Sequence, residues 1–475
     1  MDNGLENGQQ RGAGRLWRRW AVGAALLAGL ALRLWWVWRF GQTTNDTRVY
    51  GEFARNLIEH GVYGWTNVVK GVLKPPLPTL IRLPGYPLFL GVCFAVFGME
   101  NYIAVMLVQV AVDLWTCLLV GGIAARIFGR RTGLAAVWLA ALCPFTANYV
   151  AAPLTEVPTL FCIVLAFYAL VRWRECGASV NRWVLVIGLA LAYAILLRPE
   201  QGLLAAAVVP AMLWIEYRKS GLASAMKTAV LVSALTLLPL VPWTVRNWRV
   251  FHVFQPLAPR YATDPGDRIN YGFQRWYRTW GVDFASTESA YWNYDGSPIA
   301  IADLPNRAFD SNAQYAETEA VLAAYDVNNV PSDALDARFA KLAQERVEAD
   351  PLRYYVVLPV ARVLNMMFRP RTEMLPIPVE WWKFGQAADW FALGYAGLNA
   401  AFFGLAGWTL WRRRLWEGHR VEVWAMLATI GLRAMVLLTV DNSEPRYTLE
   451  FFPVLIVLGS AVAAKRKASS MSCQL

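Results

Sequence analysis

Residues 16–50 read LWRRWAVGAALLAGLALRLWWVWRFGQTTNDTRVY, and this stretch decides the class of fold. Its first part, residues 16–38, is dominated by apolar side chains. A transmembrane helix needs about 20 such residues, because the hydrocarbon core of a bilayer is about 30 Å thick. The tryptophans that end the run are typical of the interface between lipid and water. The run is too long for a cleavable signal peptide, so we interpret it as a membrane span that opens into a polar outer loop.

Apolar runs of this kind recur along the whole chain. Of the 475 residues, 57% are hydrophobic and 17% are charged, whereas a soluble protein carries about 25% charged residues. This composition excludes a disordered chain, a disulfide-rich secreted scaffold and an ordinary cytosolic enzyme, and it indicates an all-α, multi-pass membrane protein. About ten spans are predicted, at residues 16–38, 102–124, 133–150, 156–173, 183–197, 200–216, 226–245, 388–410, 422–440 and 448–464. Two further apolar segments, 84–98 and 352–369, are predicted to lie in or dip into the outer face.

The positions of Lys and Arg orient these spans, since cytoplasmic loops carry an excess of both. The short segments that we assign to the inside hold 20 basic residues, whereas the short outer segments hold 8. The resulting organisation has three parts: an N-terminal transmembrane module (1–245) with a first outer loop (39–85), a large outer loop or small subdomain (246–387) that contains the interfacial helix 352–369, and C-terminal transmembrane helices with a cytoplasmic tail (388–475). Within the large outer loop, the spacing of apolar residues predicts an amphipathic helix over 333–349.

Metal ligands and nucleic-acid contacts find little support in the sequence. The six cysteines and three histidines lack metal-ligand spacing, and the chain has no D-x-D motif. The sequence therefore requires no metal or other cofactor, although a divalent cation is compatible with it. The net charge of +11 falls mainly on the segments assigned to the inside, so no nucleic-acid partner is expected.

Charged motifs stand at the outer ends of the predicted spans. In chain order they are Asn45-Asp46-Thr47-Arg48, Arg82-Leu83-Pro84-Gly85-Tyr86-Pro87, Leu154-Thr155-Glu156-Val157-Pro158, Leu197-Arg198-Pro199-Glu200, Pro242-Trp243-Thr244-Val245-Arg246-Asn247 and Glu444-Pro445-Arg446-Tyr447. In this order and on one side of the membrane, they resemble the GT-C membrane glycosyltransferases of family 39, near protein O-mannosyltransferases and the lipid A aminoarabinose transferase. The resemblance covers most of the chain and implies a GT-C-type transmembrane helix bundle with a small outer-facing subdomain.

The resemblance also implies a reaction. Such enzymes take a sugar from a polyprenyl phosphate and transfer it, with inversion, to an acceptor on the outer side of the membrane. For this chain it implies a hexosyl- or pentosyltransferase in the bacterial inner membrane, with its site facing the periplasm or exterior. The expected partners are membrane lipid, the polyprenyl-phosphate sugar donor and a cell-envelope lipid, glycan or protein as acceptor.

Candidate site residues follow from the same motifs. Asp46 is the expected general base, because deprotonating an attacking hydroxyl requires a positioned carboxylate, and Glu156 is the second expected catalytic residue. Arginine suits a departing phosphate, since its planar fork binds oxyanions bidentately. The expected phosphate ligands are Arg48, Arg82, Arg198 and Arg446, with Arg369 and Arg371 ranked second; the expected substrate-binding residues are Tyr50, Tyr86, Glu200, Arg246, Glu444 and Tyr447.

Several of these residues also have purely structural interpretations. Asp46 and Glu156 could be helix N-caps. Arg48 could be a salt-bridge partner of Asp46, and Arg198 and Glu200 could simply pair with each other.

Three further features leave alternatives open. Arg246 could be an interface anchor. Asp113 and Arg433 fall near the middle of predicted spans, where they could pair as a structural lock. The aromatic stretch around 271–294 suits a sugar or glycolipid acceptor, or else forms the core of the small subdomain.

The competing function is a transporter or flippase of an envelope lipid or glycan, which needs a polar path at the bilayer midplane. A lower-ranked one is an envelope polymerase or ligase that uses a lipid diphosphate.

Overall fold

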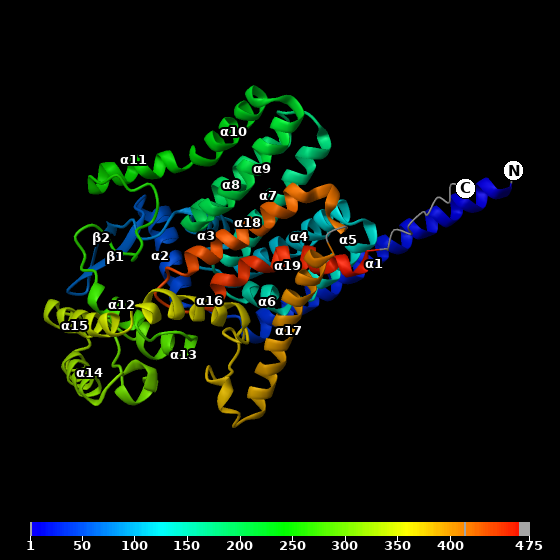
Figure 1. The fold of residues 1–475 in the computed structure, drawn as a ribbon. Coiled ribbons are helices and arrows are strands. Elements are labelled where there is room, and N and C mark those ends of the chain that lie inside the picture. Colours follow the sequence, from blue (N-terminus) through cyan, green and yellow to red (C-terminus); the bar gives the residue numbers. More distant parts are fainter. Residues whose placement is uncertain (1, 413–414, 465–475) are drawn as a thin grey trace.

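A computed structural model describes residues 2–412 and 415–464, with side chains from Trp17 onward. The predicted inner basic residues Arg413 and Arg414, the basic tail 465–467 and Cys473 lie outside this described part. The described residues form a helical bundle with a helical subdomain at one end, which confirms the predicted all-α class (Figure 1).

Every predicted span coincides with one helix or with consecutive helices. These are α1 (Asp2–Phe40), α4 (Tyr102–Ile127), α5 (Arg130–Ala141) with α6 (Pro144–Ala147) and η1 (Asn148–Ala151), α7 (Glu156–Cys176), α8 (Arg182–Leu197), α9 (Gly202–Ser220), α10 (Leu222–Leu237) with α11 (Leu240–Phe251), α17 (Ala387–Trp411), α18 (Arg420–Leu437), and η10 (Pro445–Phe451) with α19 (Phe452–Gly459) and η11 (Ser460–Ala463). Among the described helices, four are long and apolar enough to cross a membrane alone, and two bent pairs, α5–η1 and α10–α11, raise this number to six. The remaining predicted spans, α8, α9, α17 and α18, are shorter or less apolar, so the number ten is approximate.

The first outer loop and the apolar segment 84–98 after it fold into four elements. They are α2 (Asn45–His60), the antiparallel strands β1 (Gly64–Val69) and β2 (Val72–Pro78), and α3 (Gly85–Phe97). The hairpin was not predicted from the sequence. Its turn is Lys70-Gly71, both with positive φ, a conformation that glycine adopts without steric cost. The 13 residues of α3 extend for about 20 Å at 1.5 Å per residue, which is too short to cross a bilayer.

The large outer segment contains a subdomain with a core of its own. Its elements are α12 (Tyr271–Arg278), α13 (Phe284–Ser286), η3 (Thr287–Tyr291), η4 (Ile301–Asp303), η5 (Asn306–Ala308), α14 (Asn312–Tyr325) and α15 (Asp333–Ala349). The predicted amphipathic helix over 333–349 is confirmed as α15. Phe273, Trp276 and Trp280 are buried in this core with Phe339 of α15, so most of the dense aromatic stretch is subdomain core, whereas Tyr271 and Trp292 are exposed.

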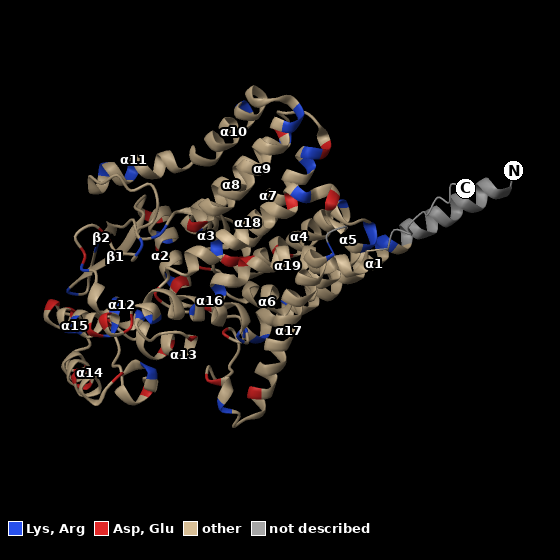
Figure 2. Cartoon of the chain, viewed as in Figure 1, with Lys and Arg blue, Asp and Glu red and all other residues tan. Residues whose placement is uncertain are grey.

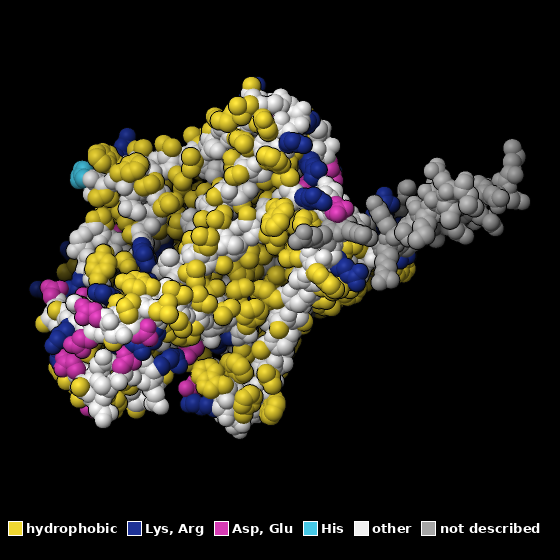
Figure 3. All heavy atoms as spheres, in the orientation of Figure 1, with side chains coloured by type: hydrophobic (Ala, Val, Ile, Leu, Met, Phe, Trp, Pro, Cys, Tyr) yellow, Lys and Arg dark blue, Asp and Glu magenta, His cyan; other side chains and the backbone are white. Residues whose placement is uncertain are grey.

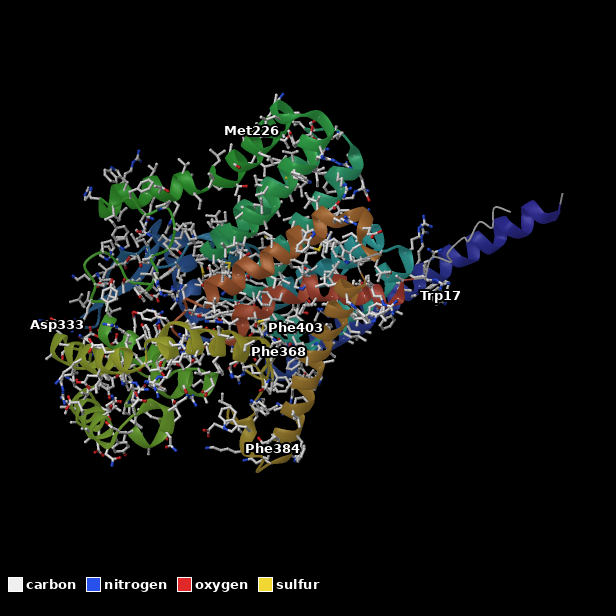
Figure 4. All side chains as sticks on the ribbon, viewed as in Figure 1. Trp17, Met226, Asp333, Phe368, Phe384 and Phe403 are labelled. Atoms are coloured by element: carbon white, nitrogen blue, oxygen red, sulfur yellow. The ribbon has the colours of Figure 1, made fainter. Side chains whose placement is uncertain are left out.

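An interfacial segment joins the subdomain to the last spans. It comprises η6 (Arg353–Val357), α16 (Leu358–Phe368) and η7 (Trp381–Lys383). Phe368 of α16 contacts Phe403 of α17, with 5.0 Å between ring centroids, and both are labelled in Figure 4.

Charge and apolar surface separate along the molecule. Figure 2 shows Lys, Arg, Asp and Glu gathered over α12–α15 and again at the opposite ends of α7–α9. Figure 3 shows an apolar surface over the bundle between them. Trp17 and Asp333 mark these opposite ends in Figure 4. This distribution fits an integral membrane protein with polar caps on both sides of an apolar belt.

One charged pair is buried inside the bundle, and it is not the predicted one. Asp113 of α4 pairs with Arg33 of α1, at 2.6 Å between Asp113 Oδ2 and Arg33 Nε. Arg33 is fully buried and also donates to the carbonyl oxygens of Gly29 and Ala141. The alternative of a lock between Asp113 and Arg433 is therefore wrong, because Asp113 pairs with Arg33 of α1 while Arg433 pairs with Glu200 and Glu450.

Candidate active site

Asp46 lies in the first turn of α2, directly after the first span. The N-cap of this helix is Thr44, whose hydroxyl accepts a hydrogen bond from the backbone N–H of Thr47 at 3.1 Å. The Thr47 hydroxyl donates to the carbonyl oxygen of Pro153 and so ties α2 to the segment before α7. The N-cap interpretation of Asp46 is wrong, since threonine does the capping and leaves the carboxylate available for other contacts.

The two carboxylate oxygens of Asp46 face two arginines. Arg446 Nη1 lies 2.9 Å from Asp46 Oδ2, and Arg82 Nη2 lies 3.6 Å from Asp46 Oδ1. Burial acts to raise the pKa of Asp46, but the charges of Arg446 and Arg82 outweigh it and hold the pKa below its usual value. Asp46 is therefore a carboxylate that stays ionised while the arginines remain beside it.

Glu156 is the first residue of α7 and is almost fully buried, at 3% exposure. The N-cap is Thr155, so the N-cap interpretation of Glu156 is also wrong. Glu156 Oε1 lies 3.3 Å from Arg198 Nη1 and 3.9 Å from Arg446 Nε. Glu156 thus links the arginine of the Arg198-Pro199-Glu200 turn to the arginine that holds Asp46.

The predicted pair of Arg198 and Glu200 is confirmed, at 3.0 Å between Arg198 Nε and Glu200 Oε1. The pair is part of a larger group. Arg433 Nη1 lies 3.0 Å from Glu200 Oε1, and Arg433 Nε lies 3.5 Å from Glu450 Oε2. Arg433 is four residues from the outer end of α18, so its long side chain reaches the outer cluster instead of the membrane centre. Glu450 was not among the residues predicted from the sequence. One signal indicated it as a candidate: it is a carboxylate inside a predicted span.

The Glu444-Pro445-Arg446-Tyr447 motif completes the group at the start of η10. Glu444 contacts Arg446 through an ion pair. Burial raises the pKa of Glu444, although the charge of Arg446 opposes this shift. The Tyr447 carbonyl oxygen accepts a hydrogen bond from Arg433 Nε at 3.3 Å, which ties α18 to η10.

We call these residues the outer ion cluster; it comprises Asp46, Arg82, Glu156, Arg198, Glu200, Arg433, Glu444, Arg446 and Glu450. Five carboxylates face four guanidinium groups, so the cluster is close to neutral with one negative charge in excess. Its members come from the first loop, the starts of α7 and η10, the turn between α8 and α9, and the end of α18. No three His, Cys, Asp or Glu side chains among the described residues are arranged to hold a metal ion.

Tyr50 and Tyr86, two of the three candidate tyrosines, lie beside the cluster. The rings of Tyr50 and Tyr86 are 5.2 Å apart in an edge-to-face arrangement. The Tyr86 hydroxyl donates to Gln109 Oε1 at 2.8 Å, which holds α3 against α4. Burial raises the pKa of Tyr50 to about 12, even though Arg82 opposes the shift.

Other candidate residues lie apart from this cluster. Arg48 is exposed on α2, and the ion pairs of Asp46 are with Arg82 and Arg446 instead. Arg246 donates to the carbonyl oxygens of Thr79 and Tyr63 at 2.7 and 2.8 Å, so it clamps the hairpin loop onto α11.

The two arginines around Pro370 also make backbone contacts. Arg371 Nη1 donates to the carbonyl oxygen of Pro445 at 2.9 Å and so holds the start of η10. Arg369 Nε donates to the carbonyl oxygen of Pro370, and its guanidinium lies over the ring of Phe284.

Comparison with known proteins bears on the fold of the chain. Residues 76–245 match the family model described as dolichyl-phosphate-mannose-protein mannosyltransferase. Comparison with curated proteins gives no match. Among solved structures, the chain is similar to the oligosaccharyltransferase AglB from the archaeon Archaeoglobus fulgidus in complex with an inhibitory peptide and a dolichol-phosphate, with a TM-score of 0.50 and 12% identity over 95% of this chain and 50% of that one. ArnT from Cupriavidus metallidurans bound to undecaprenyl phosphate gives a TM-score of 0.37 and 15% identity over 94% of this chain and 78% of that one.

These similarities concern the fold first. The chain spans about half the length of the archaeal oligosaccharyltransferase it matches. The predicted GT-C-type bundle is confirmed, and so is the resemblance to family 39 enzymes.

Proposed function

We propose that this protein transfers a sugar, with inversion, from a polyprenyl-phosphate donor to a cell-envelope acceptor on the outer face of the membrane, and that Asp46 is the general base. The observation that carries this proposal is the carboxylate of Asp46 between Arg446 and Arg82. One site thereby holds a base for the acceptor hydroxyl and two cations for the departing phosphate, and a single displacement uses both, on opposite faces of the sugar.

The lowered pKa of Asp46 fits a substrate-gated base. Before the donor binds, both arginines neutralise Asp46, and a carboxylate with a low pKa is a weak base. When the donor phosphate binds, Arg446 and Arg82 pair with the phosphate as well as with Asp46. The pKa of Asp46 then rises, because the two arginines neutralise its carboxylate less completely. The base thus gains strength only when the phosphate is in place.

The chemical step moves one proton and exchanges one bond. The acceptor hydroxyl gives its proton to an Asp46 carboxylate oxygen while its own oxygen forms a bond to the anomeric carbon. The bond between that carbon and the phosphate oxygen breaks on the opposite side, which inverts the configuration. The polyprenyl phosphate leaves with the negative charge, and Arg82 and Arg446 stabilise that charge.

Glu156 and Arg198 position these groups. Glu156 contacts both Arg198 and Arg446, so removing its charge would let Arg446 turn away from the donor phosphate. Through Glu200 and Glu450, Arg433 fixes Arg198 in turn. The sequence predicts Glu156 as a catalytic residue and Arg198 as a phosphate ligand; in the present proposal both act by positioning Arg446, and neither carries the proton.

The finer assignments are also part of the proposal. The transferred sugar is a hexose or pentose, and the protein resides in a bacterial inner membrane with Asp46 facing the periplasm.

A transporter would need an open polar path at the bilayer midplane. The buried Asp113 is instead closed off by Arg33 and its carbonyl partners, which weighs against that alternative.

The test combines a base variant with a matched control. Asp46→Asn preserves shape but cannot take a proton, so transfer should fall by about 10²- to 10⁴-fold while lipid-linked donor still binds. Glu59→Gln, on the exposed side of the same helix α2, should transfer at the parental rate.

The assay has two parts. Mass spectrometry compares envelope lipids, glycans and proteins from cells with and without the gene, which identifies the sugar and acceptor. Proteoliposomes that contain the purified chain then give the transfer rate and donor binding for each variant. A parental transfer rate in Asp46→Asn would refute the base assignment, and an unchanged envelope in cells without the gene would refute the reaction.

A further inference from the structure

A second group of arginines lies between the bundle and the subdomain, outside the outer ion cluster. Its centre is Asp441, which follows α18 and precedes Glu444 by three residues. Asp441 Oδ1 lies 3.4 Å from Arg278 Nε and 3.7 Å from Arg260 Nη2. Arg278 ends α12 and Arg260 lies in the loop after α11, so the fold brings three distant segments together here.

Arg362 of α16 is the fully buried arginine of this group. Its side chain has 0% exposure, and its Nη1 donates to the carbonyl oxygens of Arg278 and Gly281 at 3.1 and 3.0 Å. Its Nε and Nη2 have no hydrogen-bond partner among the described residues. A buried donor without a partner is destabilising, and for a charged donor the cost is larger. Two such nitrogens on one guanidinium therefore point to a missing acceptor.

Charge in this group is not balanced by the protein itself. Two guanidinium groups pair with one carboxylate, and the charge of a third, Arg362, also acts on it, whereas the outer ion cluster has more carboxylates than arginines. The contacts of Asp441 with Arg260 and Arg278 are longer than the 2.7–3.2 Å of a good hydrogen bond, and Arg278 Nε also lacks a hydrogen-bond partner. Burial, followed by repulsion from Arg278, lowers the pKa of Arg362 to about 10. Burial raises the pKa of Asp441 in spite of the three arginines.

The group is open to an incoming ligand on one side. The side chain of Arg260 is 56% exposed and that of Arg278 is 26% exposed, whereas Arg362 and Asp441 are buried. Long, exposed arginines can close on an oxyanion with two parallel hydrogen bonds, while the buried one provides a fixed charge behind it.

We propose that Arg260, Arg278 and Arg362 bind an anionic group of the acceptor, a phosphate monoester or a carboxylate, which displaces Asp441 as their counter-ion. This inference rests on the proposed function, because it places the acceptor beside Asp46. The loop 441–446 connects the two sites, and its Ser443 is held by Thr287 of the subdomain at 3.1 Å. The site therefore selects acceptors whose negative charge stands at a fixed separation from the attacking hydroxyl.

The test measures inorganic phosphate binding and needs no enzymatic activity. The full chain, in nanodiscs of phosphatidylcholine, is titrated with inorganic phosphate, and line broadening in ³¹P NMR gives the affinity. Each measurement is made in the Arg446→Gln background, so that phosphate bound at the outer ion cluster does not contribute. Arg268→Gln is the control, since this exposed arginine pairs with Asp333 on the subdomain and lies outside the proposed site.

Two variants should move phosphate affinity in opposite directions. Asp441→Asn removes the competing carboxylate and should raise the affinity about tenfold, the scale of one charge-assisted hydrogen bond. Arg260→Gln should lower it by a similar factor, and Arg268→Gln should leave it unchanged. If the cluster only stabilises the fold, Asp441→Asn should not gain phosphate affinity. Equal or weaker phosphate binding in that variant would therefore overturn the proposal. If Asp441→Asn does not fold, parental affinity in the exposed Arg260→Gln would overturn it.

A second arm separates the acceptor from a lipid headgroup. In nanodiscs of anionic phosphatidylglycerol, an occupying lipid would abolish the difference between Arg260→Gln and its background, which would overturn the acceptor assignment. A difference that persists supports the acceptor. With the acceptor identified by mass spectrometry, Arg260→Gln in the otherwise parental chain should raise the acceptor KM about tenfold while kcat stays near parental. Phosphate binding would survive a failure of the proposed reaction, so the two hypotheses fail separately.

Discussion

The ion pair between Arg33 and Asp113 allows a quantitative prediction about how the first span is held. Arg33→Leu removes the only charge that contacts Asp113 among the described residues. Asp113 is 2% exposed, so its carboxylate would be left unpaired inside the bundle. Breaking a buried pair in this way costs about 3–5 kcal/mol, which corresponds to about 10²- to 10⁴-fold in the unfolding equilibrium.

The double variant distinguishes a pairing effect from lost packing. Arg33→Leu combined with Asp113→Leu removes both charges, and replacing a buried pair by apolar side chains is often close to neutral. We therefore expect the double variant to recover most of the stability that Arg33→Leu loses. Arg39→Leu is the control, since Arg39 is an exposed arginine near the end of the same helix and should change stability by less than about 1 kcal/mol.

The assay is reversible unfolding of the purified protein in mixed micelles with increasing SDS, followed by circular dichroism. A loss in Arg33→Leu no larger than in Arg39→Leu would refute the reasoning. So would a double variant as unstable as Arg33→Leu, because the cost would then come from the lost carbonyl contacts of Arg33 and not from the stranded carboxylate. Because α1 leads directly into Asp46, a loosened first span should also reduce transfer.

The remaining predictions concern the outer ion cluster and topology. Arg446→Gln should move the acid limb of the pH–rate profile to higher pH. Arg446 lowers the pKa of Asp46, so without it the carboxylate is protonated at a higher pH. An acid limb that does not move would show that Asp46 is not the group whose protonation lowers the rate. Arg446→Lys should bind lipid-linked donor better than Arg446→Ala, whose affinity should drop about ten- to a hundredfold for one lost charge-assisted bond; equal, parental binding by both would place the phosphate elsewhere. Reporters fused after Gly64 and near Asp295 should be outside and one at Gly177 inside; an inside signal at Asp295 would contradict the proposed orientation.

Local patterns in the sequence were sufficient for the predicted spans and for the helix over 333–349, but not for α12 or α14. Apolar runs of about 20 residues and the periodicity of 333–349 depend on neighbours along the chain, and each of them coincides with a helix. The hairpin at 64–78 was missed although the signal was present. Three valines flank Lys70-Gly71 directly, and β-branched residues around an X-Gly dipeptide favour a turn between strands.

The partners of charged residues could not be predicted in the same way. The motifs identified Asp46 and Arg446 as members of one site, but nothing local shows that these two pair with each other. Arg433 was assigned to the membrane centre because depth was counted along the sequence, whereas the end of α18 and the length of an arginine side chain decide its position. Pairing depends on how helices pack, and helix packing depends on contacts over hundreds of residues.

The contact between Asp46 and Arg446 joins residues 400 positions apart, and this has a consequence for biogenesis. At about 5–20 residues per second, the ribosome needs about 20–80 s to reach Arg446 after it has made Asp46. In the proposed orientation, the first loop is already across the membrane during this time, with its carboxylate lacking that partner. Every insertion intermediate should therefore be catalytically silent, and the nascent chain cannot act on lipid-linked sugar before its last span is in place. Quality control that removes incompletely inserted chains would accordingly remove no active enzyme.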